Sequence, residues 1–205
     1  NKARNVSEAR EAMKRLGMRP QNLLLVDDQG GVFYLRAGKT PRRPSGRDWT
    51  APVPGNTSAT GWLGIHPLDE MVQVLNPRQG YLQNNNIAPD ALFAEGNLRA
   101  GDYPPWLFND RPGRLTTRGR RALDVLSRAR DWGFDEVKAF ATDEYWHTTP
   151  TWQLALRHAV REQRKRYEAL SPAARKLVER VLGFDGQARE DSAAVLKLFF
   201  GRAEA

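Results

Sequence analysis

A change in the spacing of apolar residues is the feature that most constrains how this chain can fold. The first hundred residues are interrupted by Gly, Pro and Asn and hold only short apolar runs, whereas from Thr117 onward apolar residues recur every three or four positions. Short runs favour strands, and a period near 3.6 favours amphipathic helices. The sequence therefore predicts an α+β chain that forms one unit over 1–205, with a hairpin-rich part over 1–100 and a helical part over 101–205.

Two β-hairpins are expected in the first part, because pairs of apolar runs flank turns that contain Gly. The expected pairs are Asn22–Val26 with Val32–Leu35 around 27–31, and Met71–Leu75 with Tyr81–Gln83 around 76–80. The second hairpin would deliver Asn86 just beyond its far end.

Helices with core-facing apolar stripes are expected in the second part, together with one short helix near the start of the chain. Residues with cap and stop chemistry bound three of these helices. They are Ser7 and Gly17, Ser171 and Gly183, and Asp191 or Ser192 and Gly201. The expected stripes include Ala122, Val125, Val137, Phe140, Trp152 and Leu156.

Three consecutive asparagines, 84–86, follow the second expected hairpin. Asparagine is depleted in strands, and its side-chain amide is an uncharged hydrogen-bond donor, so such a run suits the binding of a carbonyl oxygen. A second interpretation is a loop whose amides satisfy their own backbone, which is common before a proline such as Pro89. The run alone leaves both interpretations open.

Several short motifs occur around this run in a fixed order. They are Pro52-Val-Pro-Gly55, Gly61-Trp-Leu-Gly64, Pro67-Leu-Asp-Glu70, Asn76-Pro77 and Gly80-Tyr81, with Asp27–Tyr34 and Gly38–Pro41 before them and Phe184–Ala188 and Asp191-Ser192 after them. This order resembles the β-subunit of the penicillin acylase family, whose members are N-terminal-nucleophile (Ntn) amidohydrolases. The resemblance covers nearly all of the 205 residues.

The resemblance implies part of an Ntn-hydrolase αββα sandwich, in an internal segment of the β-subunit of a zymogen. The parent enzyme would hydrolyse an amide, such as the acyl side chain of a β-lactam antibiotic, an acyl-homoserine lactone or a lipopeptide. The family's nucleophile is an N-terminal Ser, Thr or Cys whose own α-amine is the base. Asn1 has no hydroxyl or thiol and the chain has no Cys. We therefore expect the nucleophile outside this chain, the remaining α- and β-segments of the precursor as partners, and no activity from the chain alone; a degenerate homologue is the alternative.

Two site residues follow from the resemblance. Asn86 matches the family's oxyanion-hole asparagine, and Arg118 matches an active-site arginine that orients the surroundings of the nucleophile. A shift of register would move the second assignment to Arg114, Arg120 or Arg121, and a solvated basic face explains these arginines equally well. His66 is interpreted as a histidine with satisfied ring nitrogens and not as a catalytic base.

No metal or other cofactor is expected. A calcium ion needs six or more oxygen ligands, several of them anionic, and residues 87–94 supply only Asp90 before Glu95. His147 and His158 have no second His or Cys at ligand spacing, which argues against zinc.

The charge balance raises a different class of function. The chain has 32 Lys and Arg against 24 Asp and Glu, a net charge of +8, and two stretches rich in Arg, 111–130 and 157–166. Such stretches can bind phosphates without sequence preference, so a basic nucleic-acid-binding module and a non-catalytic scaffold are the alternatives to an acylase segment. Nucleic-acid binding is a weaker hypothesis than an acylase segment, because the aromatic residues have helical core spacing and not the arrangement of a stacking platform.

The sequence contains no run of eighteen apolar residues and no signal-peptide pattern, so no membrane partner is expected. Members of the resembled family are commonly exported, which points to the periplasm or the extracellular space by analogy alone. The residues themselves leave the compartment unknown.

Overall fold

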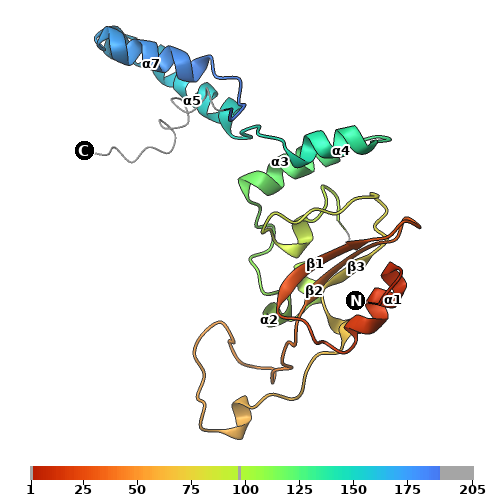
Figure 1. The fold of residues 1–205 in the computed structure, drawn as a ribbon. Coiled ribbons are helices and arrows are strands. Elements are labelled where there is room, and N and C mark those ends of the chain that lie inside the picture. Colours follow the sequence, from red (N-terminus) through yellow and green to blue (C-terminus); the bar gives the residue numbers. More distant parts are fainter. Residues whose placement is uncertain (1, 97, 190–205) are drawn as a thin grey trace. The chain divides into compact units, whose positions relative to one another are not determined.

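The structure is a computed structural model that describes residues 2–96 and 98–189 (Figure 1). The chain divides into two compact units, Asn1–Arg128 and Ala129–Ala205. The change of residue pattern near Ala100 is therefore not where the compact units divide. The first unit includes helix α3 (Thr117–Leu126) as well as all the strands that the described residues form.

The first unit contains a three-stranded antiparallel sheet in the order β1-β2-β3 (Figure 1). Strand β1 (Gln21–Val26) pairs with β2 (Val32–Ala37), with Gln21 opposite Ala37 and Val26 opposite Val32. Strand β3 (Gln73–Leu75) pairs with the other edge of β2. Consecutive residues of β2, Phe33, Tyr34 and Leu35, are all buried, so both faces of the central strand are covered.

The first expected hairpin is confirmed, since β1 and β2 flank a turn over 27–31. The carboxylate of Asp27 accepts hydrogen bonds from the N–H groups of Gly31 at 2.6 Å and Gln29 at 3.1 Å, which closes the turn. It also accepts from the N–H of Val6 at 2.9 Å, which ties the first helix to the hairpin. These backbone donors, Val6 first and then Gly31, hold the pKa of Asp27 below its ordinary value.

The second expected hairpin is wrong. Residues 81–83 form no strand, and β3 pairs with β2 instead. Asn76 continues that pairing, because its N–H donates to the carbonyl of Val32 at 2.7 Å and its Oδ1 accepts from the N–H of Val32 at 2.9 Å. The side chain of Gln83 is buried and donates to the carbonyl of Ala91 at 3.0 Å, so it organises a loop.

Helix α1 (Val6–Met13) differs from expectation at both ends. Its N-cap is Asn5, whose Oδ1 accepts from the N–H of Glu8 at 2.8 Å, and the helix ends before Gly17. Ser7 lies inside the helix. Val6 belongs to the buried core, which extends from the sheet to the loops and short helices that follow it.

Short helices lie between β2 and α3, the first two of them before β3 and the others after it. They are the 3₁₀ helices η1 (Ser58–Thr60), η2 (Leu68–Glu70), η3 (Pro89–Ala91) and η4 (Ala100–Asp102), and the single-turn helix α2 (Pro105–Phe108). Ile87, Leu92, Leu107 and Phe108 are buried in the core. The core therefore anchors the loops on both sides of the Asn run and of α2.

The described residues after Thr116 are mainly helical, as the apolar spacing predicts for them. They form α3 (Thr117–Leu126), α4 (Phe134–Ala141), α5 (Thr149–Glu162), α6 (Arg164–Glu168) and α7 (Pro172–Leu182). Helix α7 has the expected ends, since Ser171 Oγ accepts from the N–H of Ala174 at 3.2 Å and Gly183 is the C-cap. The last expected helix, from Asp191 or Ser192 to Gly201, lies outside the described residues.

The expected core stripes of these helices are only partly buried. Ala122 is buried, whereas Val137 and Trp152 are 51% and 55% exposed. Apolar spacing specifies a helix and its apolar face, but not the surface against which that face packs. Among the described residues, no helix is both long and apolar enough to cross a membrane.

Candidate functional site

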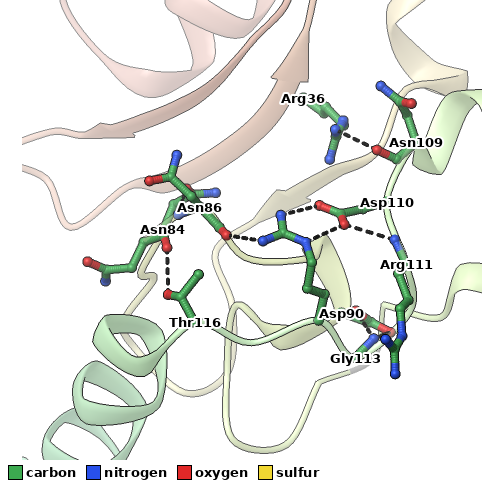
Figure 2. Close-up of polar contacts among 11 residues, drawn as sticks. Arg36, Asn84, Asn86, Asp90, Asn109, Asp110, Arg111, Gly113 and Thr116 are labelled. Carbon is green, nitrogen blue, oxygen red and sulfur yellow. Dashed lines mark hydrogen bonds and ion pairs between the residues drawn. The ribbon is translucent and has the colours of Figure 1, made fainter. Parts of the chain in front are cut away.

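Two loops of the first unit meet around the Asn run (Figure 2). One loop carries residues 83–90, and the other runs from Asn109, which ends α2, to Thr116, which caps α3. Backbone hydrogen bonds join them, because the N–H of Ala88 donates to the carbonyl of Arg114 at 2.8 Å. The N–H of Gly113 donates to both carboxylate oxygens of Asp90, at 3.0 and 2.9 Å.

The backbone of Asn86 has a left-handed conformation with φ +57°. Asn tolerates this region better than other residues with a side chain, apart from Asp. The N–H of Asn86 donates to Oδ1 of Asn84 at 3.1 Å, and its carbonyl accepts from Nη1 of Arg114 at 2.6 Å. Asn84 thus satisfies nearby backbone, as the loop interpretation expected, while Asn86 is also held from the second loop.

The side chain of Asn86 contacts the arginine that the sequence paired with it. Nη2 of Arg118 donates to Oδ1 of Asn86 at 2.8 Å, and Nη1 lies 3.5 Å from Oδ1 of Asn85. A guanidinium can only donate, so this contact assigns the amide oxygen to the Arg118 side and leaves the NH₂ pointing elsewhere. Because Asn86 is exposed, its two side-chain N–H donors are available to a ligand.

Thr116 connects the start of α3 to the Asn run. Its Oγ1 accepts from the N–H of Gly119 at 3.0 Å, as an N-cap does, and donates to the carbonyl of Asn85 at 2.8 Å. Arg118 stands two positions after this cap, in the first turn of α3. The cap therefore fixes the start of α3 against the Asn run, and with it the position from which the side chain of Arg118 extends.

Gly119 allows α3 to approach the loop closely. A Cβ atom at this position would lie 2.5 Å from Cγ2 of Ile87, the buried residue that follows Asn86. Carbon atoms in contact are normally about 3.5 to 4.0 Å apart, so a side chain here requires the loop to move. Gly119 was not among the residues singled out from the sequence.

Asp110 and Arg114 form a two-pronged ion pair beside the Asn run. Nε of Arg114 lies 2.7 Å from Oδ1 of Asp110, and Nη2 lies 2.7 Å from Oδ2. The side-chain hydrogen bonds from Arg114 hold the pKa of Asp110 below its ordinary value. Asp110 was not predicted from the sequence. The available signal was an acid four residues before a base, a spacing that favours an ion pair on a helix. Pro112 and Gly113 exclude a helix there, so the spacing did not point to a pair.

The structure thus separates the arginines that the sequence could not rank. Arg118 reaches the side chain of Asn86, Arg114 reaches its backbone carbonyl, and Arg121 pairs with Asp124 at 3.9 Å. The expectation that His66 has satisfied ring nitrogens is confirmed: it is buried, its Nδ1 lies 2.7 Å from Oε2 of Glu70, and its Nε2 accepts from Nε1 of Trp106 at 3.3 Å.

Within the described residues, no group of three or more His, Cys, Asp or Glu side chains is arranged to hold a metal ion. What the site offers instead is a set of hydrogen-bond donors. Asn86, Arg114 and Arg118 are all exposed, and both guanidinium groups donate to oxygens of Asn86, which leaves the NH₂ of Asn86 as a donor available to a ligand.

Comparison with known proteins shows the following similarities. Residues 1–200 match the penicillin amidase family. The chain is 35% identical over 79 residues to penicillin G acylase from Escherichia coli, which covers 38% of this chain and 9% of that protein. It is 26% identical over 141 residues to the penicillin acylase 2 proenzyme of Pseudomonas sp. (strain SE83), which covers 69% of this chain and 17% of that protein.

The fold is similar to that of a thermostable penicillin G acylase from Alcaligenes faecalis, with a TM-score of 0.58 and 21% sequence identity. The similarity covers 92% of this chain and 31% of that chain. The chain thus spans less than a fifth of the two curated relatives and about a third of the solved structure. The match over residues 1–200 shows that this chain belongs to the penicillin amidase family.

Proposed function

We propose that this chain is a segment of an amidohydrolase of the penicillin or acyl-homoserine-lactone acylase type. In this proposal the side-chain NH₂ of Asn86 donates to the oxyanion that forms when a nucleophile attacks the scissile amide. Arg118 is the positioning residue that holds the amide of Asn86 in the required orientation. The substrate is a small acyl-amide.

The observation that carries the proposal is the 2.8 Å hydrogen bond from Nη2 of Arg118 to Oδ1 of Asn86. It turns a freely rotating amide into a fixed donor, and preorganised donors are what an oxyanion site requires. Removal of one such donor typically costs about 2.7 to 4 kcal/mol of transition-state stabilisation. The left-handed backbone of Asn86 adds a second constraint on the direction of the amide.

The nucleophile is proposed to come from another segment of the same precursor, within an Ntn-hydrolase αββα sandwich of which β1–β3 form part. The small share of each relative that this chain covers supports this, as does the word proenzyme in the name of one relative. A further support is Asn84, whose Nδ2 is buried and has no hydrogen-bond partner among the described residues. A neighbouring segment or a substrate would supply the acceptor.

The test is turnover of acyl-amide substrates by the complete protein and its Asn86→Gly variant. Glycine accepts the left-handed backbone without strain, so this variant removes the amide and keeps the loop. We expect kcat to fall about 10² to 10³-fold with little change in unfolding temperature. An unchanged kcat would refute the role of Asn86, and a wild-type protein that hydrolyses no acyl-amide would refute the proposed activity.

The nucleic-acid alternative gains little from the geometry. Basic residues of α5 and α6 are paired locally with acids, Arg161 with Glu162 at 3.2 Å and Arg164 with Glu168 at 2.8 Å. Pairing of this kind reduces the positive field that phosphates would meet. Retention of the complete protein on heparin and on duplex DNA, measured against salt concentration, tests this alternative: a steep salt dependence on both would favour it.

A further inference from the structure

We propose that Asp110 and Arg114 form a clasp that fixes the backbone of Asn86, and that Arg114 is thereby a second positioning residue of the oxyanion site. The role in turnover rests on the proposed function, whereas the structural part of the inference does not. Arg118 acts on the side chain of Asn86, and Arg114 acts on its main chain.

The backbone of Asn86 needs such a restraint because it is exposed and in a sparsely populated conformation. A residue in the left-handed region persists there when the surrounding contacts determine it. Rotation about the backbone of Asn86 would swing both its carbonyl and its side-chain amide. The hydrogen bond from Nη1 of Arg114 to that carbonyl, at 2.6 Å, opposes this rotation.

Asp110 determines where Nη1 of Arg114 points. The guanidinium is planar, and two of its nitrogens, Nε and Nη2, are held by the two oxygens of Asp110 at 2.7 Å each. With that edge of the plane fixed, the remaining nitrogen, Nη1, points toward the carbonyl of Asn86. Lysine could supply a charge here but not the planar fork.

The clasp itself is anchored to the core. Asp110 directly follows Asn109, the left-handed residue that ends α2, and its Oδ1 also accepts from the N–H of Arg111 at 2.8 Å. The side chain of Asp110 is only 12% exposed, and Leu107 and Phe108 of α2 are buried. Contacts through Arg114, Asp110 and α2 thus connect Asn86 to the buried core.

The experiment uses the complete protein and compares Arg114→Gln and Arg114→Lys with Arg128→Gln as a matched control. Arg128 lies in the same unit and pairs with Asp124 four residues before it, but it is 76% exposed and has no assigned role in the site. Two readouts are taken for each variant. They are hydrogen exchange of the amides over residues 84–88 and, where acyl-amides are hydrolysed, kcat and KM.

We expect Arg114→Gln to raise the exchange rate over 84–88 at least tenfold and Arg128→Gln to leave it unchanged. A donor displaced by about 1 Å can cost about 10²-fold in rate, so kcat should fall by that order while KM changes little. Arg114→Lys should recover part of the loss. Unchanged exchange over 84–88 in Arg114→Gln would refute the clasp, even in a protein without acylase activity.

The two proposals fail in different ways. Raised exchange in Arg114→Gln together with no hydrolysis by the parent protein would support the clasp and refute the acylase proposal. Raised exchange with an unchanged kcat would refute the positioning role. A charge swap, Asp110→Arg with Arg114→Asp, restores an ion pair but places no donor near the carbonyl of Asn86. The stability lost in Arg114→Gln should therefore be recovered while kcat stays low. Recovery of kcat would refute the inference.

Discussion

Replacement of Gly119 by alanine tests how closely α3 must approach the Asn run. The added Cβ would lie 2.5 Å from Cγ2 of Ile87, 3.2 Å from Cδ1 of Leu115 and 3.3 Å from Oγ1 of Thr116. Ile87 is 1% exposed and cannot move outward freely. The clash therefore falls on the loop that carries Asn86.

Two opposing free energies decide the outcome. Alanine in place of glycine inside a helix stabilises by up to about 1 kcal/mol, and less in the first turn, where Gly119 lies. An extra methyl group forced into a packed interior costs about 1 to 3 kcal/mol. Overpacking should win, and Gly119→Ala should destabilise the protein by roughly 1 to 2 kcal/mol.

The assay is the midpoint of urea unfolding of the complete protein, with hydrogen exchange over residues 84–90 as a local readout. Gly101→Ala is the matched control, because nothing lies within 4 Å of a Cβ there and its φ is not positive. That variant should change the stability by less than about 0.5 kcal/mol. Ile87→Leu removes Cγ2 and should partly rescue Gly119→Ala. A Gly119→Ala protein as stable as its parent would refute the argument from close approach.

Two further predictions concern ionisable groups. Burial raises the pKa of Tyr34 to about 12, so the stability that its protonated hydroxyl provides is complete below about pH 10 and is lost as the pH rises toward 12. In an absorbance titration at alkaline pH, Tyr34→Phe should remove the tyrosine signal that ionises at the highest pH. An unaltered titration curve would contradict this. The lowered pKa of Asp27 means that its carboxylate contributes stability above about pH 4 and loses that contribution as the pH falls through the lowered value. The difference in stability between the parent and Asp27→Asn should therefore be larger at pH 7 than at pH 2, and a constant difference would argue against the role of the charge.

The first hairpin and the helices could be predicted from sequence because their signals are local. Two apolar runs around Gly30 and Gly31 specify a hairpin, and Ser171-Pro172 with Gly183 specifies the ends of α7. The second hairpin failed for the opposite reason. Which strand pairs with Met71–Leu75 depends on the free edge of β2, and sequence proximity to Tyr81–Gln83 carried no information about that edge.

For the candidate site too, the sequence predicts some features and only the tertiary structure decides others. The sequence by itself determined the residue types, since the order of the motifs singled out Asn86 and Arg118, and the family match agrees with the resemblance that this order suggested. Only the tertiary structure decided what they contact, because residues about 30 positions apart meet there: Asn86 is contacted by Arg114 from a second loop and by Arg118 from the first turn of α3. The fork of Arg114 on Asp110 and the close approach at Gly119 arise from that packing, and no local pattern encodes a distance between loops.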